Sequence, residues 1–239
     1  MLPKKKLLAG FLKKVGLLLK DILMQYMNKK IRPTFEEEKE LIGSGYKIVA
    51  GLDEVGRGAL AGPIVAAAIV LDVNKTFYGL HKIADSKSMN ERDREKTDQY
   101  IRKSALSIGI GIVEPNDIDR FGIGKANILA FHRALKNIEI DFALIDGRHF
   151  RGFEYHYRCI VKGDSKSISI AAASIVAKVY RDNLMSELHQ YNSIYGFDKH
   201  KGYGAKSHIE AILKHGPSKY HRKSFLRKLN LDQIYKMVL

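Results

Sequence analysis

The sequence predicts a fold of the α/β class, in which helices pack against a central sheet. Apolar runs of strand length are interspersed along the chain with longer segments of helical periodicity, which is the pattern of this class. Several of these runs end at acidic residues, and open α/β sheets place their binding sites at strand ends. We therefore expect the functional site at one edge of the sheet.

The first 30 residues predict a basic amphipathic helix. Apolar residues recur there at helical spacing between lysines, and Arg32-Pro33-Thr34 ends the pattern before a short helix over residues 35–41. Lys13 and Lys14 interrupt the apolar run too early for a membrane span, and no signal-peptide pattern follows. We assign residues 1–45 to this helix and a linker and expect no stable membrane insertion. Packing on the protein body or on a partner is favoured, and binding to a membrane surface stays open.

Residues 46–192 are predicted as the main α/β domain, because apolar runs and helical segments succeed one another there. Strands are expected over residues 48–53, 63–71, 105–113, 142–145 and 155–161, and helices over residues 90–102, 118–136 and 169–191. Asn90 is a suitable N-cap for the first of these helices.

Residues 193–239 are predicted as a small, basic, helical C-terminal segment. Lysine and arginine, Arg222 among them, outnumber acids there, and Tyr203 and Tyr220 lie between them. Cations that neutralise phosphates beside rings that stack on bases suit a nucleic-acid groove, although a solvated basic helix face is the plainer alternative. The segment also holds four histidines, for which phosphate contact or surface charge is favoured over metal binding: His200, His208, His215 and His221.

The composition is that of an ordinary globular protein with excess positive charge. The chain has 239 residues, 45% of them hydrophobic and 28% charged, and a formal net charge of +15, which attracts polyanions such as nucleic acid. Cys159 is the single cysteine, so the sequence excludes an intrachain disulfide and a cysteine-based zinc cluster. We expect a cytoplasmic protein.

Four carboxylates give the clearest chemical signal. Asp53 and Glu54 close the first apolar run, and Asp146 and Asp164 close later ones, so a sheet can bring all four to one edge. Because side chains alternate along a regular strand, we expect the first strand to end or bulge at Asp53 and Glu54. Clustered carboxylates repel one another and a divalent cation compensates them, and their hard oxygens favour Mg²⁺ or Mn²⁺. The sequence therefore predicts a metal-dependent phosphoryl-transfer site.

Gly56, Arg57 and Gly58 follow directly after the first two acids. Glycine lets the backbone approach a ligand closely, and an arginine between two glycines suits a phosphate or holds a loop. Residues 119–126 resemble a phosphate-binding loop, but Asp119 and Ala126 replace the required Gly and Ser or Thr. The sequence contains no zinc-hydrolase or serine-hydrolase motif.

Taken together, the motifs resemble the bacterial ribonuclease HII family. The resemblance spans about residues 46–225 and is carried by GLDEVGRGALAGP at residues 51–63, DSK at 85–87, IDG at 145–147, KGDSKSISIAAASIVAKVYRD at 162–182 and HKGY at 200–203. It implies a ribonuclease H-like fold, a mixed central sheet flanked by helices and followed by a small helical segment. It also implies an endonuclease that cuts the RNA strand of RNA–DNA hybrids and cuts on the 5′ side of ribonucleotides embedded in duplex DNA.

The resemblance further implies a role for particular residues. Metal binding and catalysis fall on the four carboxylates Asp53, Glu54, Asp146 and Asp164, with two ions supporting hydrolysis to 5′-phosphate and 3′-hydroxyl ends. The loop of Gly56, Arg57 and Gly58 would read the ribose 2′-hydroxyl, and Tyr203 would stack at the RNA-to-DNA junction. Phosphate contacts are implied for Lys87, Ser174 and Lys178. Many family members carry Thr where this chain has Ala205.

We expect the protein to be a monomer. Two other functions stay open on these residues. A nuclease of the same fold, such as a DNA junction resolvase or a transposase-like enzyme, would share the scattered carboxylates but would not require a 2′-hydroxyl. A non-catalytic nucleic-acid binder would explain the charge and the tyrosines, but its acidic cluster would repel phosphate unless a metal is bound. Comparison of ribonucleotide-containing, all-DNA and all-RNA substrates separates these functions.

Overall fold

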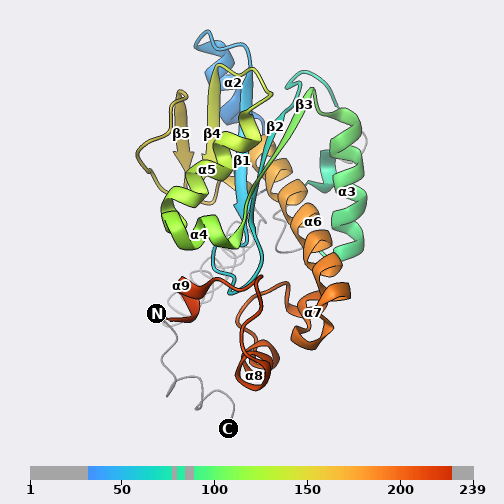
Figure 1. Ribbon diagram of the computed structural model, residues 1–239. Helices are drawn as coiled ribbons and strands as arrows, with labels where there is room; N and C mark the ends of the chain where they lie inside the picture. The colour runs from blue at the N-terminus through green and yellow to red at the C-terminus, as the bar shows by residue number, and fades with distance from the viewer. Residues whose placement is uncertain (1–31, 77–79, 84–88, 228–239) are drawn as a thin grey trace, which may run out of the picture. The chain divides into compact units, whose positions relative to one another are not determined.

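A computed structural model of the chain describes residues 32–76, 80–83 and 89–227 (Figure 1). The helix predicted over residues 1–30 lies outside this part, and so does Lys87. The division of the chain at residues 45 and 192 stays a prediction. None of the helices in the described ranges is both long enough and apolar enough to cross a membrane.

Five strands form one mixed sheet in the order β3-β2-β1-β4-β5. β1 (Val49–Val55), β2 (Ile64–Val70) and β3 (Ser107–Val113) pair antiparallel, whereas β4 (Phe142–Asp146) runs parallel to β1, and β5 (Tyr157–Ile160) parallel to β4. In the β1–β4 register, Leu52 lies opposite Ile145. Asp53 and Asp146 are the next residues along these two strands, so the parallel pairing puts two predicted carboxylates at neighbouring positions.

Helices cover both faces of this sheet (Figure 1). α4 (Pro115–Phe121) and α5 (Ile123–Leu135) lie on one face, against Ala66 and Ala68 of β2. α3 (Glu91–Ser104), which follows the short η1 (Leu80–Lys82), and the long α6 (Ile168–Tyr191) lie on the other face, against Ala67 and Ile69. Because β2 is buried on both faces, its sequence is an unbroken apolar run.

The start of α6 packs closely against β1. A Cβ atom at Gly51 would lie 2.1 Å from the backbone carbonyl carbon of Ser169, so only glycine fits there. Ser167 caps α6 by accepting the Ile170 N–H, and the buried Glu38 of α2 (Glu36–Gly43) accepts hydrogen bonds from Ser167 and Ser169. These contacts fix the start of α6 directly after η3 (Gly163–Ser165), the turn that contains Asp164.

Two predicted elements differ from the structure. The helix expected over residues 118–136 is two helices, α4 and α5, because Gly122 has a φ of +79° and interrupts the helical backbone. The first strand neither ends nor bulges at Asp53 and Glu54, since β1 pairs regularly with β2 through Val55. The remaining predicted strands and helices within the described ranges are present, and Asn90 caps α3 by accepting the Asp93 N–H.

The C-terminal segment packs beside the loop that follows β1. It contains the short helices η4 (Ser193–Tyr195), α7 (Phe197–His200), α8 (Lys206–His215) and α9 (Lys223–Leu226). The carbonyl of Gly202 accepts the Leu60 N–H at 2.8 Å, and the Gly62 N–H donates to the carbonyl of Tyr220 at 2.9 Å. These bonds hold the segment at the end of the sheet towards which β1 and β4 run (Figure 1).

Candidate active site

A pocket of about 510 Å³ lies at the ends of β1 and β4. It is lined by most of the residues that the sequence singled out, namely Asp53, Glu54, Gly56, Arg57, Gly58, Asp146, Ser174, Lys178 and Tyr203. Arg94 of α3 also lines it, although the sequence analysis did not single out this residue. The DSK motif just before α3 was the signal that could have found it.

Asp53 and Glu54 reach this pocket from opposite faces of the sheet. Asp53 faces α6, where Ser174 lowers the pKa of its carboxyl, and Glu54 faces α5, where Asn127 does the same. The ordinary alternation of a strand is therefore kept, and the pocket extends around the strand end to meet both side chains. This explains why no bulge is needed for two adjacent acids to share one site.

Burial and mutual repulsion raise the pKa of both acids. Asp53 is 8% exposed, and burial, followed by the charges of Glu54 and Asp146, raises its pKa well above the ordinary value. Burial also raises the pKa of Glu54, whereas Arg57, with Nη1 3.6 Å from Glu54 Oε1, opposes the rise. Buried carboxylates that lie close together despite their mutual repulsion are typical of a cation-binding site.

Asp146 and Asp164 occupy different positions relative to the pocket. Asp146 ends β4 and lines the pocket, and its Oδ1 accepts the Gly163 N–H at 2.6 Å. Asp164, the next residue after Gly163, is 5% exposed within η3 and is not one of the lining residues. Among the residues that the structure describes, no three acidic, histidine or cysteine side chains stand close enough to hold a metal ion as placed. The structure therefore brings together Asp53, Glu54 and Asp146, and Asp164 stays a prediction.

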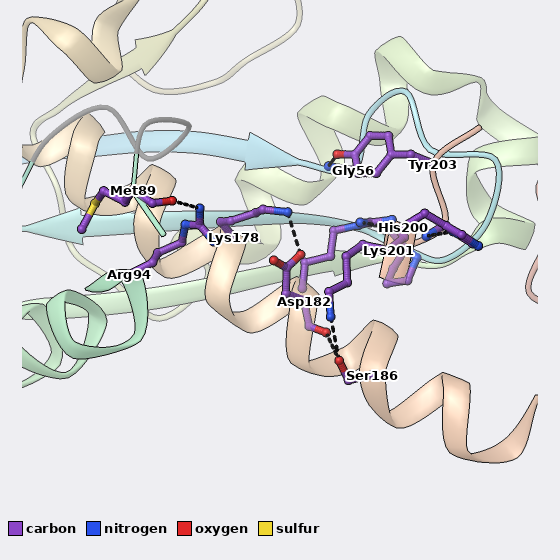
Figure 2. Close-up of polar contacts among 12 residues, drawn as sticks. Gly56, Met89, Arg94, Lys178, Asp182, Ser186, His200, Lys201 and Tyr203 are labelled. Carbon is purple, nitrogen blue, oxygen red and sulfur yellow. Dashed lines mark hydrogen bonds and ion pairs between the residues drawn. The ribbon is translucent and has the colours of Figure 1, made fainter. Parts of the chain in front are cut away.

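Gly56 joins two distant parts of the chain at the pocket edge. Its N–H donates to the Tyr203 hydroxyl at 3.2 Å (Figure 2). Its φ is +87°, and a Cβ atom there would lie 2.1 Å from Arg181 Nε, so both the backbone and the packing require glycine. The Arg181 guanidinium carbon in turn lies 5.3 Å from the centre of the Tyr203 ring.

Two buried arginines form hydrogen bonds with the backbone of the loop that follows β1. Arg181 donates to the carbonyl of Pro63, and Arg222 donates to the carbonyls of Arg57 and Gly62. Burial lowers the pKa of Arg222 to about 9 and lowers that of Arg181 as well. Arg222 was predicted as part of a nucleic-acid groove, but it is fully buried and binds the backbone.

Cations from α3 and α6 form another wall of the pocket. Lys178 Nζ lies 2.8 Å from Asp182 Oδ1, and Arg94 Nη2 donates to the carbonyl of Met89 at 2.7 Å (Figure 2). Both side chains line the same pocket as the three carboxylates. The pocket thus offers positive charge beside the acids, as a polyanionic ligand requires.

Two histidines of the C-terminal segment overturn the favoured prediction of phosphate contact or surface charge. His208 and His221 are 0% and 2% exposed, so neither forms part of the surface. Burial lowers the pKa of each to about 4, which keeps both rings neutral near pH 7. Basic neighbours in the sequence suggested an exposed run, and only the packing of the C-terminal segment shows that both rings are buried.

The mixed five-strand sheet flanked by helices matches the fold of ribonuclease H-type nucleases. The chain superposes on ribonuclease H2 from Pyrococcus horikoshii OT3 with a TM-score of 0.63 and 24% identity, covering 80% of this chain and 97% of that one. It superposes on Bst-RNase HIII in complex with Mn²⁺ with a TM-score of 0.57 and 22% identity, covering 80% and 70%. The predicted ribonuclease H-like fold is confirmed.

The sequence relatives narrow this class to one family. The family model of Ribonuclease HII matches residues 50–228. Ribonuclease HII of Clostridium botulinum (strain Hall) is 47% identical over 190 residues, 78% of this chain and 70% of that protein. Ribonuclease HII of Chlamydia caviae is 48% identical over 191 residues, 79% and 88% of the two chains. The chain therefore belongs to the ribonuclease HII family, hydrolytic nucleases of the ribonuclease H type that act on RNA–DNA substrates and typically depend on metal ions.

Proposed function

We propose that this protein cuts the RNA strand of RNA–DNA hybrids and cuts duplex DNA on the 5′ side of embedded ribonucleotides. Such an activity serves ribonucleotide removal during DNA replication and repair, in the cytoplasm. The observation that carries the proposal is the pairing of the Gly56 N–H with the Tyr203 hydroxyl at the pocket edge. A ribose 2′-hydroxyl both donates and accepts hydrogen bonds, so it complements an amide donor and a phenol, whereas DNA offers no such group.

The carboxylates suit Mg²⁺ or Mn²⁺, and we assign two ions to Asp53, Glu54, Asp146 and Asp164. The fit rests on the donor set, which is made of hard oxygens, and on the mutual repulsion that raises the pKa of Asp53. Bound ions would supply nucleophile activation and charge stabilisation at the phosphate, which gives 5′-phosphate and 3′-hydroxyl ends. Ser174 and Asn127, which lower the pKa of Asp53 and of Glu54 respectively, would help to orient these two carboxylates.

The remaining pocket residues bind and orient the nucleic acid in this proposal. Lys178 and Arg94 meet phosphates on the α3 and α6 side, with Asp182 holding the Lys178 side chain in place. Lys87 has the same proposed role. The Tyr203 ring, backed by Arg181, presents a flat surface on which a nucleotide can stack. Contacts to backbone and ribose carry little information about the base, so base identity should hardly matter.

The test is cleavage of four labelled substrates with Mg²⁺, with Mn²⁺ and with a chelator: duplex DNA holding one ribonucleotide, all-DNA duplex, RNA–DNA hybrid and all-RNA duplex. We expect metal-dependent cleavage of the first and third only, with the cut in the first substrate on the 5′ side of the ribonucleotide. Equal cleavage of all-DNA duplex would instead support a junction-type DNA nuclease. Tight binding without cleavage under every metal condition would support a non-catalytic binder.

A further inference from the structure

A chain of hydrogen bonds runs from the C-terminal loop to the backbone of Tyr203. His208 Nδ1 lies 2.8 Å from the Tyr203 carbonyl oxygen, and His208 Nε2 lies 3.0 Å from His221 Nε2. His221 Nδ1 lies 2.9 Å from both the backbone nitrogen and the Oγ of Ser218. We call Ser218, His221 and His208 the histidine relay.

The chemistry of each contact fixes where the protons lie. A carbonyl oxygen only accepts, so His208 carries its proton on Nδ1, and its Nε2 is an acceptor in the neutral ring. His221 must then donate from Nε2, which leaves its Nδ1 as an acceptor. The Ser218 N–H, which only donates, lies at that Nδ1. All three contacts agree on one direction, from Ser218 through His221 and His208 to the Tyr203 carbonyl.

The surroundings of the histidine relay are aromatic and favour neutral rings. The His200 ring stacks on His208 with centres 4.4 Å apart, and Phe197 meets His208 edge-on at 5.5 Å. Tyr195 meets His221 edge-on at 4.8 Å. Among these contacting rings, His200 and Tyr195 are the ionisable ones. Low polarity strengthens the hydrogen bonds of the histidine relay and opposes protonation of its rings.

The histidine relay ends at Tyr203, which lines the pocket. The backbone of Tyr203 is the terminal acceptor of the histidine relay, while its hydroxyl receives the Gly56 N–H at 3.2 Å. We propose that His208 and His221 are positioning residues, which set the Tyr203 ring against the Gly56 amide and so adjust how the ribose is held. This inference rests on the proposed function of the site.

The first test needs no substitution. Nitrogen-15 spectra of the full-length protein with labelled histidine report which ring nitrogen carries the proton. We expect His208 in the Nδ1–H form and His221 in the Nε2–H form at pH 7. Either residue in the opposite tautomer, or as a charged ring, would overturn the histidine relay.

The second test compares two substitutions of one buried side chain. His208→Asn places an amide near the Nδ1 position, so it keeps the hydrogen bond to the Tyr203 carbonyl. His208→Gln places an amide near the Nε2 position, so it keeps the contact with His221 and loses the hydrogen bond to Tyr203. Cleavage of the single-ribonucleotide duplex is measured for the wild type and both variants. We expect KM to rise about tenfold in His208→Gln, the size of one lost hydrogen bond, and to stay within about twofold in His208→Asn.

A purely structural role predicts a different result. Partial unfolding lowers the concentration of active enzyme and hence the apparent kcat, but leaves KM unchanged. Equal KM values in the two variants, whether raised or not, would therefore overturn the positioning role. If wild-type protein left the ribonucleotide duplex uncut, the proposed function would fail, and the tautomers would still decide whether the histidine relay exists.

Discussion

The carboxylate pocket and the histidine relay differ in whether their buried polar groups have compensating partners. In the pocket, Asp53 and Glu54 lie among like charges, and their pKa values rise. In the histidine relay, each nitrogen of His208 and His221 has a partner of the right kind. The first region keeps an electrostatic cost that a ligand can relieve, whereas the second is satisfied without any ligand. This difference is what we expect if the pocket carries the proposed chemistry and the histidine relay positions Tyr203 beside it.

Removal of the charge of one acid should have the largest effect on the carboxylate pocket. Asp146→Asn should lower cleavage of a ribonucleotide-containing duplex by more than about a thousandfold, because a charged metal ligand is lost. Its free energy of unfolding should be equal or slightly higher, because one repelling charge is gone. Single-turnover cleavage and urea unfolding measure the two effects, and Asp53→Asn should behave alike. Asp198→Asn, at the partly exposed surface of α7, is the matched control, and wild-type turnover by Asp146→Asn would remove that residue from the site.

A fall in pH should lower the free energy of unfolding, because His208 and His221 of the histidine relay are neutral in the folded protein. The pKa of His208 and of His221 is about 4 in the folded protein against about 6.5 unfolded, so below pH 6.5 the unfolded chain binds more protons. Stability is therefore fully present above pH 6.5 and declines towards pH 4, by about 3 kcal/mol for each histidine. Urea unfolding from pH 7 to pH 4 measures the slope. The slope should be shallower in His208→Asn, and equal slopes would contradict the assignment.

Tyr203 connects the pocket with the histidine relay, and two substitutions separate the contribution of its ring from that of its hydroxyl. Tyr203→Ala should weaken binding of the ribonucleotide duplex by about 1–3 kcal/mol, because the stacking surface is lost. Tyr203→Phe keeps the ring and its stacking, and should lose only the contribution of the hydroxyl that contacts the Gly56 N–H and that we propose meets the ribose, about 1 kcal/mol. Binding and cleavage are measured with matched all-DNA duplex as the control. If Phe proved as damaging as Ala, the hydroxyl and not the ring would carry the interaction.

The smallest expected effect concerns Ala205, which stands at the N-cap of α8 without a side-chain hydrogen bond. Ala205→Thr places a hydroxyl where it can accept the backbone N–H groups of the first turn of α8. The free energy of unfolding should rise by about 1 kcal/mol. Thermal or urea unfolding checks this, with Ala205→Val as a control of similar size and shape. An equal gain in the valine variant would show that packing, not capping, is responsible.

The sequence by itself determined most of the fold and the chemical class of the site. Apolar runs located the strands because burial on both faces demands them, as in β2. Asp53, Glu54 and Asp146 were found from their places at the ends of such runs, since parallel strands β1 and β4 bring their ends together. The Asn90 cap followed from local chemistry alone.

The arrangement of the side chains around the pocket, and the contacts that hold the pocket in place, depend on long-range packing. The local sequence does not reveal that Asp53 and Glu54, on opposite faces of one unbroken strand, line one pocket, because residues of α3, α6 and the C-terminal segment complete that pocket. His208, His221 and Arg222 lie in a basic stretch and were predicted at the surface or in a groove, yet all three are buried. His208 binds the backbone carbonyl of Tyr203, and Arg222 binds those of Arg57 and Gly62. Every residue has a backbone carbonyl, so the sequence does not show which ones are used as acceptors.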